Sequence, residues 1–186
     1  MKKTITLLLF ITISCFLVAQ NYTAKIPGTG QWKSNELLTF SSFDGQSKIV
    51  MMTLAKKVQK NDHSIKHLKI DGTAYQLIRL ADAINLTDAA GHILLKTNAG
   101  RTEVFSAKNE KFTKIKTNRQ LQYRDVDNQV IVGGIIHRGQ IFVKNYGTQA
   151  HPMLTVLCME ELLQQEHQRQ KNDGLIPIIS SSLLND

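Results

Sequence analysis

The sequence predicts a mainly β (or α+β) protein in which an antiparallel meander or barrel surrounds one buried C-terminal helix. From residue 93 to residue 146, turn signals recur about every ten residues, which is the spacing of an antiparallel meander. Apolar and polar residues alternate within several of these segments, as expected for strands that bury one face. One helical segment follows, and its first half is apolar on nearly every side, so other elements must enclose it.

The N-terminal segment has the pattern of a secretory signal peptide. Lys2 and Lys3 precede an apolar run that is short for a membrane span, and Ala19 supplies the small residue needed at a cleavage site. We therefore expect residues 1–19 to be a signal peptide and the protein to be exported, either periplasmic or secreted. The leader resembles Bacteroidetes-type secretory signal peptides. Cys15 follows a segment that loosely resembles a lipobox, so a lipoprotein anchored through Cys15 stays an open alternative.

Without that leader, the chain has the length and apolar content of a single domain. We expect an extended N-terminal arm at residues 20–35, one globular domain at residues 36–174 and a C-terminal tail at residues 175–186. Cys158 is then the only remaining cysteine, so the core must stabilise the fold without a disulfide inside the chain. The apolar residues around Cys158 predict a buried thiol with a packing role.

The first part of the domain has the pattern of strands joined by tight turns. Residues 36–43 and 65–70 are apolar segments that each run into an Asp-Gly dipeptide, a sequence that favours hairpins. Residues 47–59 and 75–90 fit both helical and strand periodicity. We favour strands for both, because Asp-Gly turns precede them.

The second part continues in the same way. Strands are expected at residues 92–96, 101–107, 112–117, 120–126, 129–136 and 140–146. The fifth of these segments is apolar on both faces, which favours a central place in the sheet. Within it, Gly133 and Gly134 indicate a bulge or a close approach of another part of the chain.

Residues 150–171 are predicted to form the helix. Pro152 lies in the first turn, where a proline is tolerated, and Asp173-Gly174 is expected to end the helix. The second half of the helix is polar. It is expected to present an exposed surface that carries His167 and three glutamates, Glu160, Glu161 and Glu166.

Two hairpin segments and the helix share the pattern of a known barrel family. Residues 86–95 read Leu-Thr-Asp-Ala-Ala-Gly-His-Ile-Leu-Leu, with an aspartate, a turn, a glycine and an apolar pair. Residues 122–131 are a looser copy, and residues 152–163 form the apolar helix. This pattern is similar to that of the tubby-like barrels, the group that includes phospholipid scramblases and the LURP-one-related proteins. The resemblance implies a closed barrel around one helix, and a scaffold that meets lipid or anionic ligands.

No local motif for catalysis, cofactor binding or metal binding occurs in the sequence. The nucleophile elbow, the zinc-protease motif and the phosphate-binding loops are absent. His63 and His67 have the spacing of a helical metal site, but a strand would hold them too far apart to bind one ion. We therefore expect neither catalysis nor a cofactor. The alternative is a secreted hydrolase with a dispersed active site that uses His92, His137 or His151.

The chain has a formal net charge of +8, and the basic excess is concentrated in its middle. We choose Lys114, Lys116 and Arg119 as candidate contacts for an anion. The expected partner is an anionic lipid or polysaccharide, or an envelope protein that meets a sheet face or a strand edge. No nucleic acid is expected, because the aromatic residues are few and dispersed. After the leader, no segment has the length of a transmembrane helix, so an integral membrane protein is not expected. These observations favour an exported, non-catalytic binding or accessory protein of the cell envelope.

Overall fold

The structure is a computed structural model that describes residues 21–25, 37–42, 48–53, 63–146 and 151–182. Within these residues the chain forms twelve strands and one helix. The strands are β1 (Asn21–Lys25), β2 (Leu37–Ser42), β3 (Lys48–Thr53), β4 (Ser64–Ile70), β5 (Thr73–Arg79), β6 (Ile84–Asp88), β7 (Ile93–Thr97), β8 (Glu103–Ser106), β9 (Lys111–Lys116), β10 (Gln120–Arg124), β11 (Val130–His137) and β12 (Gln140–Asn145). The helix is α1 (Pro152–Ser182). The predicted signal peptide lies outside the described residues.

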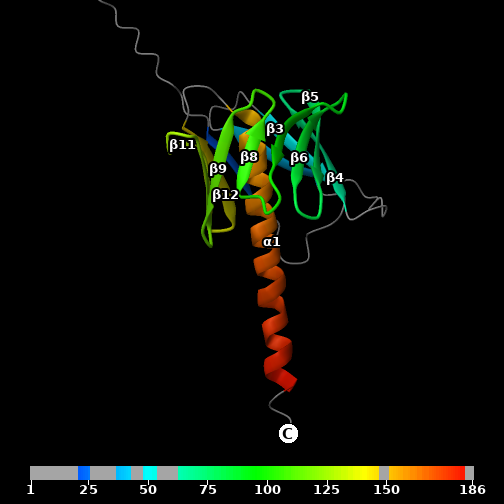
Figure 1. The fold of residues 1–186 in the computed structure, drawn as a ribbon. Helices are drawn as coiled ribbons and strands as arrows, with labels where there is room; N and C mark the ends of the chain where they lie inside the picture. Colours follow the sequence, from blue (N-terminus) through cyan, green and yellow to red (C-terminus); the bar gives the residue numbers. More distant parts are fainter. Residues whose placement is uncertain (1–20, 26–36, 43–47, 54–62, 147–150, 183–186) are drawn as a thin grey trace, which may run out of the picture.

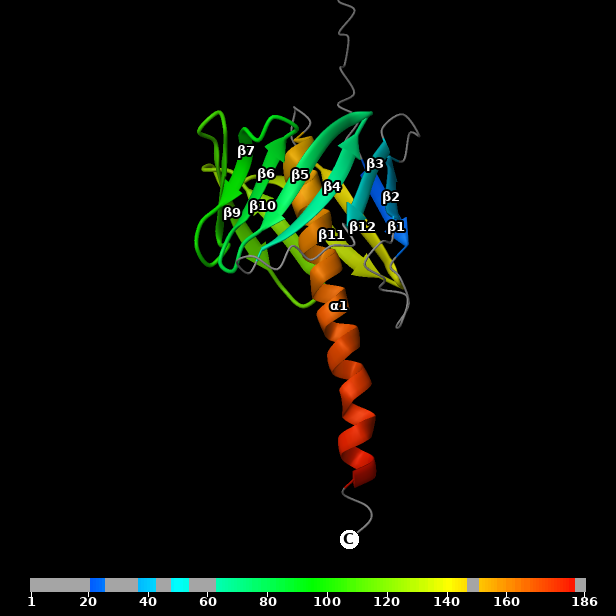
Figure 2. The same ribbon diagram turned by 90° about the vertical axis from the view of Figure 1, so that its right-hand side faces the viewer.

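The strands form one antiparallel sheet that closes on itself. From β4 to β12 each strand pairs with the next, which is the predicted meander. β1 pairs with both β12 and β2, and β3 joins β2 to β4, so the strand order forms a ring. Figure 2 shows the strands surrounding the first turns of α1. The predicted fold class, a mainly β meander or barrel with one C-terminal helix, is confirmed.

Both ambiguous segments are strands where the structure describes them. Within residues 47–59 the structure describes β3, and residues 47 and 54–59 lie outside the described residues. β5 and β6 account for most of residues 75–90. The predicted N-terminal arm needs a correction, because its residues 21–25 are not separate from the domain. They form β1, which hydrogen-bonds between β12 and β2 and so belongs to the barrel.

Two hairpin turns use residues in the left-handed region of the backbone. The φ angles are 47° at Asp71 and 83° at Gly72, and 47° at Arg138 and 71° at Gly139. Two consecutive positive φ values are typical of the turn type whose twist matches the flanking strands. The predicted Asp-Gly hairpin at residues 71–72 is confirmed, whereas the Asp-Gly pair at residues 44–45 lies outside the described residues.

The first half of α1 fills the interior of the barrel. Residues 154–163 are buried without interruption, as the apolar pattern of the sequence predicted. Inward-facing leucine, isoleucine and valine side chains of the strands pack around them. Cys158 belongs to this core, and its burial raises the pKa of the thiol well above the ordinary value. Cys158 therefore packs as a small apolar residue.

Gly134 lets the helix approach the wall of the barrel. A Cβ atom at this position would lie 2.6 Å from Leu162 Cδ1 and 3.0 Å from Cys158 Sγ. The predicted close approach is therefore confirmed for Gly134. The irregularity of pairing between β10 and β11 lies elsewhere, next to Arg124.

The predicted end of the helix is wrong. α1 does not stop at Asp173-Gly174 but continues to Ser182, so most of the predicted C-terminal tail is helical. A glycine inside a helix costs about 1 kcal/mol and need not end it. Figure 1 shows this part of α1 projecting beyond the strands. No helix among the described residues combines the length and the apolar character needed to cross a membrane.

The predicted exposed surface of the helix is also wrong for its three glutamates. Glu160, Glu161 and Glu166 are all buried. Each of them is paired with a cation, and for Glu160 and Glu161 these cations come from strands far away in the sequence. Burial of a carboxylate is tolerated when such partners are present, and local sequence patterns do not reveal them.

Candidate functional site

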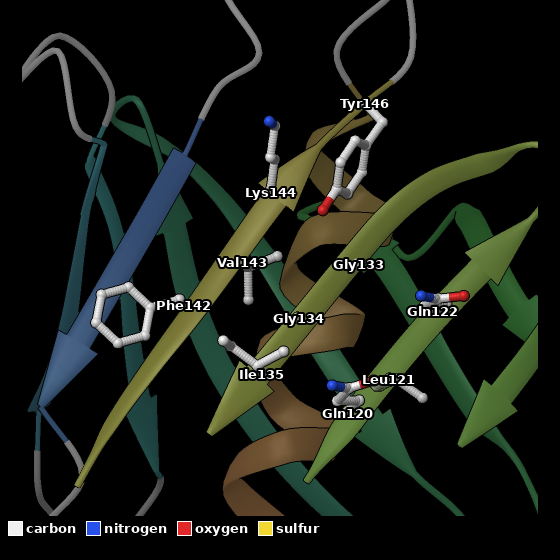
Figure 3. Close-up of a pocket in the computed structure, with 10 residues that line it drawn as sticks. All are labelled: Gln120, Leu121, Gln122, Gly133, Gly134, Ile135, Phe142, Val143, Lys144 and Tyr146. Carbon is white, nitrogen blue, oxygen red and sulfur yellow. The ribbon is translucent and has the colours of Figure 1, made fainter. Parts of the chain in front are cut away.

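A groove of about 480 Å³ lies on the outer wall of the barrel, over β10, β11 and β12 (Figure 3). Six side chains that line it are Gln120, Gln122, Ile135, Phe142, Lys144 and Tyr146. On each strand these residues alternate with residues that are buried against the core. The alternation of the strands therefore gives the same wall an apolar inner face and a mixed outer face.

The strand register arranges the groove in cross-strand rows. One row consists of Gln120, Ile135 and Phe142. The next row consists of Gln122, Gly133 and Lys144. Because Gly133 has no side chain, the second row has a gap at its centre, with one polar side chain on either side.

An aromatic ring borders this gap. A Cβ atom on Gly133 would lie 3.2 Å from Tyr146 Cε2, so the ring rests on the backbone of β11. Lys144 Nζ is 4.9 Å from the centre of the same ring, which is within the range of a cation–π interaction. Tyr146 is 53% exposed and Lys144 is exposed, so the ring and the ammonium group are both accessible from solvent.

Arg124 fixes the orientation of the Gln122 amide. Arg124 Nη2 donates to Gln122 Oε1 at 2.9 Å, and Arg124 Nε donates to the same oxygen at 3.3 Å. Since the oxygen is engaged, the Gln122 Nε2 donor is turned toward β11 and the gap at Gly133 (Figure 3). Both polar side chains beside the gap, Gln122 and Lys144, therefore present hydrogen-bond donors.

The strands around the groove carry no acidic residue. β9, β10, β11 and β12 contain neither aspartate nor glutamate. Asp125 and Asp127 lie in the turn between β10 and β11, where Asp125 Oδ1 accepts backbone N–H groups of Asp127 and Gln129. An anion in the groove would therefore meet cations and donors without competition from a carboxylate of these strands.

Lys114, one of the predicted anion contacts, faces the inside of the barrel. Its Nζ atom lies 3.3 Å from Glu161 Oε2 of α1, and its side chain is 10% exposed. Burial lowers the pKa of Lys114, an effect that the neighbouring Glu161 only partly offsets. The helix itself therefore supplies the anion that this lysine contacts.

Lys116 and Arg119, the other two predicted contacts, are exposed where α1 leaves the barrel. The turn between them accepts hydrogen bonds from the side-chain amide of Gln165. The pKa of Glu166 is lowered mainly by its hydrogen bond from Arg169, and Arg119 adds a smaller electrostatic contribution. None of the three predicted contacts lines the outer groove, and they lie instead around the buried and emerging parts of α1.

Glu160 connects α1 to two further strands. Its Oε2 atom is 2.7 Å from Lys66 Nζ of β4, and its Oε1 atom is 3.1 Å from Arg79 Nη2 of β5. The side chains of Lys66 and Arg79 are 15% and 20% exposed, and that of Glu160 is fully buried. The inner ion pairs therefore bind the helix to the wall and are not open to a ligand.

None of the three histidines proposed for a hydrolase site lines the outer groove. His92 Nδ1 lies 2.8 Å from Asp88 Oδ2 in an exposed turn, and this hydrogen bond is the main reason why the pKa of Asp88 is lowered. His137 is exposed at the end of β11. These two histidines are therefore surface residues of turns or strand ends.

His151 lines a second cavity, of about 280 Å³, together with Ser106 and Glu110. Ser106 Oγ donates to Glu110 Oε2 at 2.8 Å and accepts the backbone N–H groups of Lys108 and Glu110. The His151 ring packs edge-on against Phe112, with 5.5 Å between the ring centroids. The hydroxyl of Ser106 thus stabilises a turn, and its proton is directed at a carboxylate instead of at the histidine that a nucleophilic serine requires.

The predicted histidine pair lies in strand geometry. His67 is on β4 and His63 directly precedes that strand, so the segment is not the helix on which this spacing suits a metal. Among the described residues, no group of three or more histidine, cysteine, aspartate or glutamate side chains could hold a metal ion.

Sequence reasoning missed Gln122, Lys144 and Tyr146 as candidate ligand contacts. The sequence contained one indication of this site. Gly133 interrupts an apolar strand, and a hairpin turn at residues 138–139 places Lys144 opposite Gly133. Comparisons with protein-family models, with curated proteins and with solved structures found no match to this chain.

Proposed function

We propose that this chain is an exported, non-catalytic binding protein of the cell envelope, and that its outer groove binds the carboxylate of an anionic ligand. The observation that carries the proposal is the pair of donors beside Gly133. These donors are the ammonium group of Lys144 and the Gln122 amide, which Arg124 orients. The export and envelope parts of the proposal rest on the signal-peptide pattern of residues 1–19.

The donors fit a carboxylate for a chemical reason. An ammonium group and an amide N–H can both donate, and neither can accept, so together they favour an acceptor-only group. A carboxylate is such a group, and its hydrogen bonds to a charged donor are stronger than those between neutral groups. Tyr146 and Ile135 offer apolar surface along the gap for the body of the ligand. A ring that carries a carboxylate, such as an acidic sugar, combines both features.

The groove is backed by the core of the barrel. Behind Gly133, the next residue Gly134 packs on Leu162 and Cys158 of α1. The donors stand on strands whose other faces are buried, so the backbone that carries them is held in place before a ligand arrives, and Arg124 orients the Gln122 amide. Such an arrangement supports a binding role, because less conformational entropy is lost when the ligand binds.

We also propose that the chain is a distant relative of the tubby-like barrels. A ring of twelve strands around an apolar helix supports this, because it is the arrangement that the sequence resemblance implies. A fold does not determine a ligand, so the ligand is argued from the groove alone. The secreted hydrolase is less well supported, because Ser106 beside His151 gives its proton to Glu110.

A nuclear magnetic resonance titration with galacturonate, and with galactose as the neutral control, tests the proposal. Galacturonate should shift the backbone amide signals of Gln122, Gly133 and Lys144, and galactose should bind much more weakly. Lys144→Gln should weaken galacturonate binding about tenfold, close to the lower end of the range of about 1.5–3 kcal/mol that a hydrogen bond to a charged group contributes, because Lys144 is exposed to solvent.

Lys69→Gln is the matched control, because Lys69 is an exposed lysine on β4, which the groove does not include. Equal binding of the two sugars, or unchanged galacturonate affinity in Lys144→Gln, would overturn the proposal.

A further inference from the structure

A second groove, of about 580 Å³, lies farther round the outer wall, over β7, β8 and β9. Lys96 lies opposite Phe105, and Phe105 lies opposite Lys111, so an aromatic side chain stands between two lysines. Each of the three has a buried neighbour on its own strand, which turns it to the outer face. This groove repeats the combination of cation and aromatic ring found at Lys144 and Tyr146.

The second groove has an excess of positive charge. Lys111 Nζ is 2.6 Å from Glu103 Oε1, a pair in which both side chains are substantially exposed. Lys96 is exposed and makes no ion pair with the described residues. Of the two lysines, Lys96 is therefore the one available to an external anion.

Arg124 lies between the two grooves. It is paired with Thr113 of β9, two residues along that strand from Lys111, and on its other side it orients Gln122. Together the cations form a diagonal band across the wall, which we name the cationic stripe, and Glu103, the partner of Lys111, lies beside it in the row of Arg124. The cationic stripe consists of Lys96, Lys111, Arg124 and Lys144, on β7, β9, β10 and β12.

The length and the curvature of the cationic stripe restrict its partner. Five strand spacings separate β7 from β12 in a ring of twelve strands. This is on the order of 24 Å along the wall, because neighbouring strands lie about 4.8 Å apart. A flat membrane would touch a convex wall along a narrow band only, whereas a flexible chain can follow the curve.

We infer that the ligand is a flexible acidic polysaccharide that follows the cationic stripe and occupies both grooves. Its carboxylates contact Lys144 in one groove and Lys96 in the other, and its sugar rings lie against Tyr146 and Phe105. The inference rests on the proposed function, which it deepens from a single carboxylate to a polymer. Two linked sites on one polymer raise the affinity for long chains above that for a single sugar.

Binding of galacturonate oligomers of increasing length tests the inference. Affinity should rise with length until both grooves are occupied, and it should fall with added salt, which screens exposed charges. Lys96→Gln should weaken binding of long oligomers about threefold to fivefold, the range of one exposed charge contact, and should leave the monomer unaffected. Lys69→Gln is again the control.

The outcomes separate the two proposals. If Lys144→Gln weakens binding, but neither oligomer length nor Lys96→Gln changes the affinity, the proposed function of the single groove stands and the polysaccharide inference is wrong. If Lys144→Gln has no effect on monomer or oligomer, the proposed function is wrong as well. Binding to vesicles with anionic lipid but to no oligomer would replace the polysaccharide by a membrane surface and so overturn the inference.

Discussion

The inner and outer faces of the same barrel wall use their cations in opposite ways. On the inner face, Lys66, Arg79 and Lys114 are mostly buried and contact carboxylates of α1. On the outer face, Lys96 and Lys144 are exposed, and neither forms an ion pair within the described residues. Successive side chains of a strand point to opposite faces of the sheet. A cation on one face therefore pairs with the helix, whereas a cation at a neighbouring position of the strand faces solvent and can bind a ligand.

This difference explains why total charge was a poor guide to the site. The basic middle of the chain suggested Lys114 as an anion contact, but Lys114 and the buried Phe112 share the inner face of β9. The cations available to a ligand are those whose neighbours on the strand are buried.

Removal of the Glu160 carboxylate, which pairs with two cations, should have one of the two largest effects on stability. Glu160→Ala leaves Lys66 and Arg79 beside the core without their anion, and breaking such a buried pair costs about 3–5 kcal/mol. Urea unfolding measures this loss. Glu103→Ala is the outer-face control, because its pair with Lys111 is exposed and should contribute about 0–1 kcal/mol. Similar losses in both variants would contradict the distinction between the two faces.

Two adjacent glycines give a second comparison between the faces. Gly134→Ala pushes a Cβ atom to 2.6 Å from Leu162 Cδ1 in the core, and overpacking of this kind costs about 1–3 kcal/mol. Gly133→Ala places its Cβ atom 3.2 Å from the exposed Tyr146 ring, which can move. It should cost less than about 0.5 kcal/mol but weaken galacturonate binding. Thermal unfolding of both variants measures the two losses of stability. A larger loss of stability in Gly133→Ala than in Gly134→Ala would contradict this prediction.

The buried thiol should make the protein less stable in alkaline solution. Burial raises the pKa of Cys158 above its ordinary value of 9.0, so above pH 9 the unfolded chain loses this proton and the folded chain keeps it. Stability that is present below pH 9 is then lost as pH rises, by about 1.4 kcal/mol for each pH unit. Urea unfolding at several pH values below and above 9 measures how steeply stability falls with pH. Cys158→Ala should make this fall above pH 9 less steep. An unchanged slope would show that the thiol is not the cause.

The smallest effect is expected at Lys116. This lysine is exposed where α1 leaves the barrel and does not line the outer groove. Lys116→Gln should change the free energy of unfolding by less than about 0.5 kcal/mol, and it should leave the affinity for galacturonate unchanged. Isothermal titration would detect a contribution of Lys116, which would extend the site toward the end of the barrel.

Strand positions and turns could be predicted from the sequence because their signals are local. Asp71-Gly72 adopts the backbone that an Asp-Gly hairpin requires, and the apolar run around Cys158 correctly indicated an enclosed helix. The orientation of β9 could not be predicted with equal ease, because both of its faces are mixed. Lys114 can face inward only because Glu161, 47 residues away in the sequence, lies opposite it.

The candidate groove depends on register, which the sequence encodes only partly. The turn at Arg138 and Gly139 pairs Gly133 with Lys144, and this part could be worked out from the hairpin. The place of Gln122 depends also on the pairing of β10 with β11, and the orientation of its amide depends on Arg124. Such side-chain contacts follow from the assembled sheet and not from a local motif.

The most direct measurement compares Lys114→Gln with Lys144→Gln in two assays, the free energy of unfolding and the affinity for galacturonate. We expect Lys114→Gln to cost about 3–5 kcal/mol of stability, because Glu161 is left buried without its cation, and we expect the remaining folded protein to bind galacturonate normally. Lys144→Gln should leave stability nearly unchanged and weaken binding about tenfold. The reverse pattern, or a loss of binding in Lys114→Gln alone, would show that Lys114 and not Lys144 contacts the ligand.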